Sequence, residues 1–294
     1  MTISFVCLPL SGHLNPMIAL ARKLQSRGHE VSFIGVADSA AIVRAADLPF
    51  TSYCEDEFPP GAVAKTWGPV SQMHGMDVVR YGLVEINPKL LDAALRHLPE
   101  KIKENGIEAL VLDPIHFFVE LVPMALKIPF VQVCTVLHLD SSGATPPSLF
   151  SWPYDTAPEA LARNGQGLQE VASFFAASVP IAAAYAEKAG LQVDWSRPGA
   201  TNSKLAFITQ TPREFDFPGI PWPAEFHYTG PFADNTGRRL IPFNWDWLNG
   251  DPLIHASLRN GCEPADADPQ DDSSGGSEIS EGAGCVFGRE ECRC

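Results

Sequence analysis

The sequence contains few basic residues for its length. Lys and Arg together number 21 against 35 Asp and Glu in 294 residues, which gives a formal net charge of −14 at pH 7. Because nucleic-acid phosphates and anionic lipid headgroups are bound through basic surfaces, this balance argues against both as partners. The chain also lacks any run of about 18 apolar residues, so we predict no transmembrane segment.

Phosphate-binding glycine motifs and a secretion signal are absent as well. The segment SGHLNP, at residues 11–16, is not a GxGxxG motif, and nothing in the chain resembles a P-loop. A direct dinucleotide fingerprint is therefore missing, which weakens a dehydrogenase interpretation. The first ten residues, MTISFVCLPL, have no basic start and are typical of a strand rather than of a signal peptide.

Cysteine is sparse in the body of the chain. Seven cysteines are present, and only three of them, Cys7, Cys54 and Cys134, precede residue 262. Because these three are isolated in or near apolar stretches and the total is odd, we interpret them as buried thiols of a cytoplasmic protein. The late residues Cys285, Cys292 and Cys294 have no second Cys-x-x-Cys pair or His partner, so we predict no metal site.

Apolar runs alternate with helical patterns over the first 230 residues, within a composition (45% hydrophobic, 19% charged) that is typical of globular proteins. This alternation predicts an α/β fold, a Rossmann-like doubly wound parallel sheet with the strand order 3-2-1-4-5 and right-handed crossovers. Strands are expected at residues 3–8, 31–36, 49–53, 109–112, 130–134, 205–209 and 226–228.

Capping residues give the expected helix boundaries. Asn15 is a good N-cap, Pro16 a good first helical residue and Gly28 a good C-cap, so the first helix is expected to begin within two residues of Asn15. Further helical segments are expected at 71–104, broken by Pro88 and Pro99; at 116–126; and at 159–188, in two pieces around Gly165, Gly167 and Pro180.

We predict three regions along the chain. Residues 1–230 form the Rossmann-like domain, residues 231–258 a linker and the first strand of an incomplete second domain, and residues 259–294 an acidic, cysteine-containing tail. From residue 262 onward there are nine acids but only three large apolar residues other than cysteine. Since so few apolar groups cannot offset the entropy cost of ordering, we expect the tail to be disordered.

The expected topology places two titratable residues side by side. His13 follows the first strand and Asp113 ends the fourth, and adjacent strands lie about 4.8 Å apart. A histidine oriented by a carboxylate is a general base for a hydroxyl group. Both residues also suit ordinary turns, so spacing alone leaves that alternative open. The remaining histidines are interpreted as surface or packed residues, although His116 is close enough in sequence to Asp113 to line the same cleft.

The segment GHLNPMIALARKLQSRGHEVSFIG, at residues 12–35, resembles the opening of the family 1 UDP-glycosyltransferases, in particular the bacterial macrolide and zeaxanthin glucosyltransferase branch. EALVLDP, at 108–114, carries the matching acidic position, and PLIHASL, at 252–258, resembles the first strand of the family's second domain. The resemblance implies the N-terminal half of a GT-B fold. It implies that His13 is the base and that Asp113 orients it.

The resemblance also implies the chemistry. These enzymes transfer a hexose from a UDP-sugar, which is a co-substrate rather than a cofactor, to a hydroxyl of a small lipophilic acceptor with inversion. No metal is required by that scheme. Residues placed near the expected cleft are candidates for acceptor binding, although core packing explains them nearly as well: Gly12, Asn15, Trp67, Met76, His116, Phe117 and Leu137.

The chain departs from the family after Leu258. The donor-binding signature of a second domain does not follow, and the polar tail takes its place. We therefore expect a truncated or frameshifted C-terminal part. Two other functions remain open: a non-catalytic remnant or half-domain that only binds a lipophilic ligand and, more weakly, a sugar-nucleotide epimerase.

The first prediction is that this chain alone does not transfer sugar. Without a second domain the diphosphate has no helix N-terminus to bind, and the sugar is not held over His13. Calorimetry with UDP-glucose and a product assay with hydroxylated acceptors check this expectation. Micromolar binding of UDP-glucose, or repeated turnover, would contradict it.

Overall fold

The computed structural model describes residues 1–236, 254–256 and 285–287. The chain divides into two compact units. The first consists of Met1–Val63 and Gly75–Arg238, and the second of Ala64–His74 and Arg239–Cys294. The large sheet and the candidate site both belong to the first unit.

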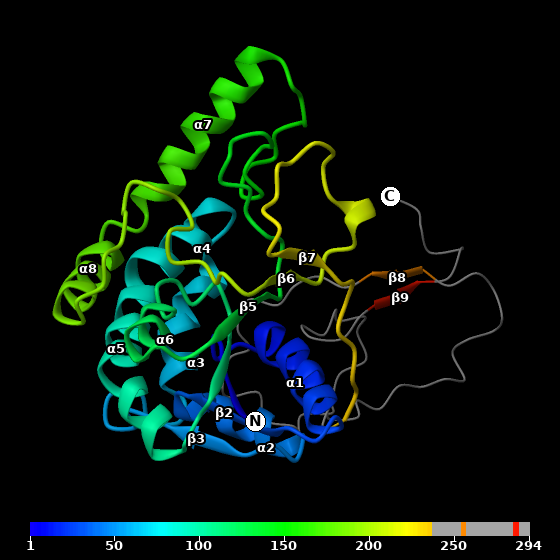
Figure 1. Cartoon of the computed structure of the whole chain (residues 1–294). Helices are drawn as coiled ribbons and strands as arrows, with labels where there is room; N and C mark the ends of the chain where they lie inside the picture. The colour runs from blue at the N-terminus through cyan, green and yellow to red at the C-terminus, as the bar shows by residue number, and fades with distance from the viewer. Residues whose placement is uncertain (237–253, 257–284, 288–294) are drawn as a thin grey trace. The chain divides into compact units, whose positions relative to one another are not determined.

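A parallel sheet runs through the first unit in the order β3-β2-β1-β4-β5-β6-β7 (Figure 1). Every neighbouring pair in this order is parallel, and β1 pairs with both β2 and β4. The predicted doubly wound sheet with a central first strand is therefore confirmed. Its strands are β1 (Thr2–Val6), β2 (Glu30–Gly35), β3 (Phe50–Ser52), β4 (Ala109–Leu112), β5 (Phe130–Cys134), β6 (Phe207–Thr209) and β7 (Phe226–Tyr228).

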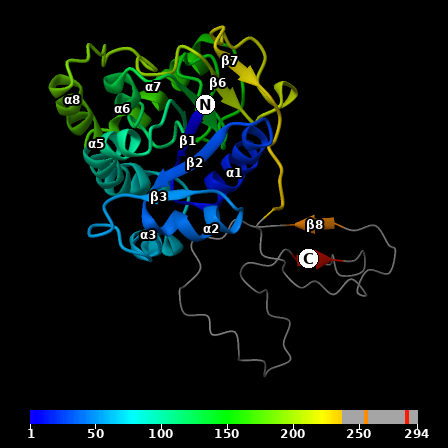
Figure 2. The ribbon, with the colours of Figure 1, turned by 60° about the horizontal axis from the view of Figure 1, so that its bottom comes forward.

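Helices flank this sheet, with α1 and α5 on opposite sides of it (Figure 2). On the α1 side, Phe5 of β1 stacks on Phe33 of β2 in a buried cluster that includes Met17 of α1. Ser4 and Val6, whose side chains alternate with Phe5 and face the other side, are also buried, so both faces of the sheet are covered. The α-helices are α1 (Ser11–Gln25), α2 (Ala40–Ala45), α3 (Ala62–Trp67), α4 (Met76–Tyr81), α5 (Asn87–Glu104), α6 (Leu121–Leu126), α7 (Pro158–Ser173) and α8 (Ser178–Lys188). Shorter helical turns are η1 (Ala37–Ser39), η2 (Gly68–Gln72), η3 (Gly82–Ile86) and η4 (Arg213–Phe215).

The first helix begins earlier than the capping pattern predicts. α1 starts at Ser11, because the N–H groups of His13 and Leu14 both donate to the carbonyl of Leu10 at 2.9 Å. Asn15 is therefore inside the helix and not its N-cap, and Pro16 lies in the second turn. A proline there removes only the hydrogen bond to the carbonyl of Gly12, which is exposed and open to water. As a result, His13 lies in the first turn of the helix.

Two other helix boundaries also differ from the prediction. The helix expected from residue 116 begins only at Leu121, because Phe118 has a φ of 69° and a left-handed residue interrupts a right-handed helix. The break expected at Pro99 is absent, since α5 continues through it. The break within the 159–188 segment lies between Ser173 and Ser178 instead of at the glycines.

The long loop after β5 is fixed against α7. Asp140 accepts hydrogen bonds from the N–H groups of Ser142 (2.8 Å) and Thr145 (3.0 Å), and Asn164 of α7 donates to the carbonyl of Gly143. Further along, Phe150 and Trp152 stack with their ring centroids 4.2 Å apart. These two rings lie against Gly167 of α7, where an added Cβ would be 2.7 Å from the indole of Trp152.

The contact between Gly167 and Trp152 predicts opposite effects for two alanine substitutions in α7. Gly167→Ala should destabilise the chain by about 1–3 kcal/mol, because the new methyl group overlaps Trp152. Gly165→Ala should stabilise it by about 0.5–1 kcal/mol, because alanine favours the helix and its Cβ has no heavy atom within 4 Å. Urea unfolding midpoints of the two variants check the prediction, and equal midpoints would contradict it.

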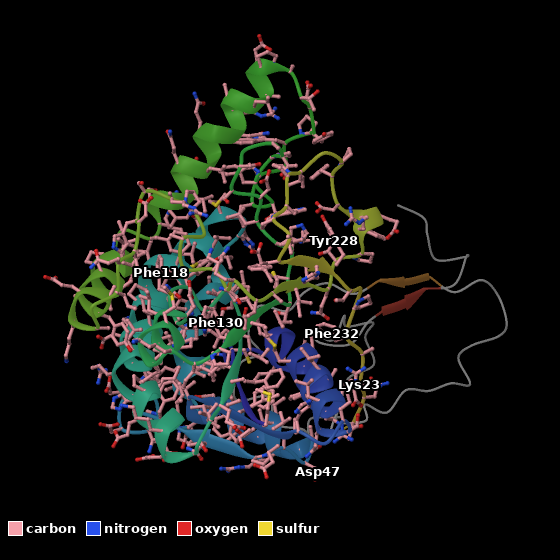
Figure 3. The ribbon with its side chains drawn as sticks, in the orientation of Figure 1. Lys23, Asp47, Phe118, Phe130, Tyr228 and Phe232 are labelled. Atoms are coloured by element: carbon pink, nitrogen blue, oxygen red, sulfur yellow. The ribbon has the colours of Figure 1, made fainter. Side chains whose placement is uncertain are left out.

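The chain leaves the sheet along α1. After β7, the N–H of Phe232 donates to Oε1 of Gln210 at 2.8 Å. The side chain of Phe232 packs against the core cluster next to α1 (Figure 3). Arg22 of α1 then binds Asp234, with Nε 2.9 Å from Oδ2. The segment that leads to residue 236 is therefore held in place on the first unit.

The second unit contains a small two-stranded sheet. β8 (Ile254–Ala256) and β9 (Cys285–Phe287) pair antiparallel. β8 lies where a strand was expected, and β9 lies in the tail that was expected to be disordered. Residues 237–253, 257–284 and 288–294 lie outside the described residues, so the domain boundaries and the disorder of the remaining tail stay predictions.

Within the described part of the chain, no single helix combines the length and hydropathy of a membrane span. Only α7 and α8 taken together reach both, and they are bent by 71° at their break.

Candidate functional site

A buried histidine–carboxylate pair lies at the carboxyl edge of β1 and β4. Nδ1 of His13 is 2.7 Å from Oδ2 of Asp113, although the two residues are 100 positions apart in the sequence. Their side chains are 7% and 0% exposed. The parallel pairing of β1 with β4 sets Val6 opposite Leu112, so Asp113 emerges beside the turn that leads into α1. The predicted adjacency of the two residues is present in the structure.

The carboxylate of Asp113 is held by the main chain on both sides. Oδ1 accepts a hydrogen bond from the N–H of Ile115 at 3.0 Å, and Oδ2 accepts a longer one from the N–H of Leu8 at 3.4 Å. The N–H of Asp113 itself donates to the carbonyl of Val6, which extends the β1–β4 ladder by one bond. These bonds fix the direction of the carboxylate before any ligand arrives.

The hydrogen bond to Asp113 sets the tautomer of His13. With an ionised carboxylate as acceptor, Nδ1 carries the proton, and the lone pair of Nε2 remains available. Nε2 of His13 forms no hydrogen bond with the described residues. A neutral imidazole with an open Nε2 can accept a proton from a hydroxyl group.

A third residue in this site was not predicted. The hydroxyl of Thr135 lies 3.1 Å from Nδ1 of His13. Thr135 directly follows β5, which is the neighbour of β4 in the sheet. The signal that could have identified it is positional, since the residues just after adjacent parallel strands meet at one edge.

The groups around Asp113 are neutral. Burial raises the pKa of the Cys7 thiol well above its ordinary value, and the Asp113 carboxylate adds to the increase. Burial raises the pKa of Cys134 to about 12; the hydrogen bond to the Val136 carbonyl opposes this increase, and the Asp113 carboxylate adds to it. Burial lowers the pKa of His116 to about 4, although Asp113 opposes this shift. Neither thiol is therefore a nucleophile at neutral pH.

Three predicted acceptor residues lie next to the histidine–carboxylate pair in sequence or structure. Gly12 is exposed and precedes His13 in α1. The N–H of His116 donates to the carbonyl of Asp113 at 3.0 Å, and its ring is buried with no partner for Nδ1 among the described residues. Leu137 follows Thr135 by two positions and is 65% exposed.

The other predicted acceptor residues have different surroundings. Asn15 is half-buried in the interior of α1, and Met76 is half-buried at the start of α4. Phe117 packs edge-on against Phe175, with the ring centroids 4.6 Å apart. Trp67 ends α3 and belongs to the second unit. Acceptor contacts by these four residues stay predictions.

Comparison with known sequences supports the resemblance to glycosyltransferases. The chain is 25% identical over 250 residues to a zeaxanthin glucosyltransferase from Pantoea ananas, covering 85% of this chain and 57% of the relative. It is 26% identical over 229 residues to a zeaxanthin glucosyltransferase from Pseudescherichia vulneris, covering 77% and 53%. The chain thus spans about half the length of the curated relatives that it matches. No family model matches it.

Solved structures support the fold. The glycotransferase of kitacinnamycin matches with a TM-score of 0.51 and 20% identity over 85% of this chain and 54% of its own. The calicheamicin glycosyltransferase matches with a TM-score of 0.51 and 19% identity over 78% and 52%. Together with the parallel sheet, these matches confirm the predicted fold class, a Rossmann-like doubly wound sheet like that of the N-terminal half of a GT-B fold, and the predicted resemblance.

The site predicts a tautomer that can be measured. In the wild-type chain the ring of His13 should carry its proton on Nδ1. In Asp113→Asn, an amide N–H directed at Nδ1 should move that proton to Nε2. Nitrogen-15 spectra of histidine-labelled protein distinguish the two forms, and the same substitution at the exposed residue Asp77 is the control. An unchanged tautomer in Asp113→Asn would contradict the assigned role of the carboxylate.

Proposed function

We propose that this chain is the acceptor-binding half of an inverting, UDP-sugar-dependent glycosyltransferase that transfers a hexose to a hydroxyl of a small lipophilic molecule. The observation that carries the proposal is the hydrogen bond of His13 to Asp113, which leaves Nε2 without a partner among the described residues at the carboxyl edge of the parallel sheet. In parallel α/β sheets, ligands bind at this edge, where the strand order reverses.

The proposed reaction is a single displacement. Nε2 of His13 takes the proton of the acceptor hydroxyl as the acceptor oxygen forms a bond to the anomeric carbon. The bond between that carbon and the phosphate oxygen breaks, and UDP leaves with the electron pair. Attack from the face opposite the leaving group inverts the anomeric configuration. Asp113 stabilises the imidazolium that develops and keeps the ring oriented.

Exposed apolar residues support a lipophilic acceptor. Val136, Leu137 and Leu139 follow Thr135 and are 39%, 65% and 39% exposed. Apolar side chains gathered beside a polar reactive group are typical of sites for small apolar ligands. The names of both curated relatives support the same class, because zeaxanthin is an apolar molecule that carries hydroxyl groups. The same names support a glucosyl donor.

The nucleotide sugar needs groups beyond the described residues. The relatives are nearly twice as long as the matched segment, and in the proposed scheme the donor is bound by the half of a GT-B enzyme that this segment does not cover. We also infer a cytoplasmic protein, since Cys7, Cys54 and Cys134 are buried free thiols in the structure.

The proposed base can be tested in a chimera. Residues 1–236 joined to the C-terminal half of one of the curated relatives should transfer glucose from UDP-glucose to an apolar phenol. His13→Ala should then lower the rate by about 10²–10⁴-fold, the usual effect of removing a general base. His227→Ala, at an exposed histidine on β7, is the matched control. Equal activity of His13→Ala and the control would refute the assignment.

A further inference from the structure

A second buried histidine–carboxylate pair lies farther along the same edge of the sheet. Nε2 of His138 is 3.0 Å from Oδ2 of Asp216, and the two side chains are 6% and 9% exposed. His138 follows β5, and Asp216 lies in the loop between β6 and β7. The proposed reaction uses neither residue, and the sequence offers no motif that connects them.

One carboxylate oxygen of Asp216, Oδ2, accepts three hydrogen bonds. Besides His138, the indole N–H of Trp222 donates to Oδ2 at 3.1 Å, and the hydroxyl of Tyr228 donates to the same atom. Burial opposes ionisation of Asp216, but the hydrogen bonds from Tyr228, Trp222 and His138 outweigh it and hold the pKa below its ordinary value. The N–H of Phe217 donates to Oδ1 at 2.8 Å. The carboxylate is therefore charged and fully engaged.

The ring of His138 is held by hydrogen bonds at both nitrogens and by contacts with aromatic rings. Its Nδ1 lies 3.1 Å from the hydroxyl of Thr209, the last residue of β6. The rings of Trp222, Phe226 and Tyr228 contact it edge-on, with centroids 5.0, 5.1 and 6.0 Å away. Tyr228 is the last residue of β7 (Figure 3). Because both ring nitrogens are engaged, His138 has no free atom with which to take a proton from a substrate.

We propose that His138 is a positioning residue for the acceptor side of the site, and that it acts through Asp216. The segment 135–138 is anchored at both ends: Thr135 contacts Nδ1 of His13 at 3.1 Å, and His138 binds Asp216. The three residue steps from Thr135 to His138 span at most about 10 Å. A segment this short with both ends fixed can adopt few conformations.

Two consequences follow for the reaction. The anchored segment presents the exposed side chains of Val136 and Leu137 at the edge where the acceptor binds. It also holds the hydroxyl of Thr135 against the imidazole that serves as base. A displacement of about 1 Å in such a contact can lower a rate by about a hundredfold. This inference rests on the proposed function for its role in catalysis, but the anchoring itself is a property of the chain that can be tested alone.

The experiment uses the 294-residue chain, with nitrogen-15 in its histidines and carbon-13 in its valine and leucine methyl groups. His138→Ala removes the anchor, whereas His138→Gln keeps an N–H that can donate to Asp216. His227→Gln changes an exposed histidine of β7 and serves as the control. Three quantities are measured: the order parameters of the Val136 and Leu137 methyl groups, the ring signals of His13, and the affinity for 2-naphthol as a hydroxylated apolar probe.

In His138→Ala the methyl order parameters should fall, the His13 signals should shift, and the Kd for 2-naphthol should rise by about tenfold, the equivalent of one charge-assisted hydrogen bond. His138→Gln should restore most of each change, and the control should show none. Methyl groups of the core residues Leu112 and Val133 should keep their order parameters in every variant. Together, these results would support the positioning role.

Other results would overturn the inference. Unchanged methyl order and unchanged His13 signals in His138→Ala would show that the segment needs no anchor. Loss of order at Leu112 and Val133 as well would show that His138 supports the whole fold rather than this segment. If His138→Ala does not fold, Asp216→Asn decides by the same measurements. If the wild-type chain does not bind 2-naphthol, the proposed acceptor function fails, while the methyl and imidazole signals still decide on the anchor.

Discussion

The buried carboxylate of Asp113 is the constraint on which the rest of this edge of the sheet depends. An ionised carboxylate removed from water is stable only where hydrogen-bond donors surround it. Here two backbone N–H groups and the ring of His13 provide that environment. Both the Leu8 turn and the first turn of α1 must therefore take one conformation, and the parallel pairing of β1 with β4 must be in a single register. The same contacts that stabilise the charge orient the base.

Most of the sheet could be predicted because its signals are local. Short apolar runs between turn residues identified β4 and β5 with their observed bounds, and the alternation with helices gave the strand order. Helix starts were less predictable. Pro16 favours the first position of a helix. In the structure, however, the carbonyl of Leu10 accepts a hydrogen bond from the N–H of Leu14 and closes an earlier turn. No local pattern in the sequence indicates which of these two helix starts has the lower free energy. The turn before α6 likewise depends on one left-handed residue, Phe118.

The site residues that were not predicted from the sequence share one property. Thr135, His138 and Asp216 acquire their roles from partners that are distant in the sequence, and their nearest sequence neighbours carry no information about those partners. Asp113 was found because it directly follows β4, and His13 because it lies in the segment that leads from the adjacent strand β1 into α1. The same rule applied to β5 would have found Thr135. It would not have found Asp216, which lies within the loop between β6 and β7 and not at the end of a strand.

The two histidine–carboxylate pairs at one edge of one sheet show what separates a reactive pair from a structural one. Both histidines contact a buried carboxylate at a distance of 3.0 Å or less, and both are at least nine-tenths buried in their side chains. The difference is the second ring nitrogen. In His138 it faces the hydroxyl of Thr209 inside a box of aromatic rings, so any proton transfer to it would break an existing bond. In His13 it has no partner among the described residues, so a substrate hydroxyl can supply one. A carboxylate therefore fixes a histidine in either case, and the environment of the opposite nitrogen determines whether the fixed ring can act as a base.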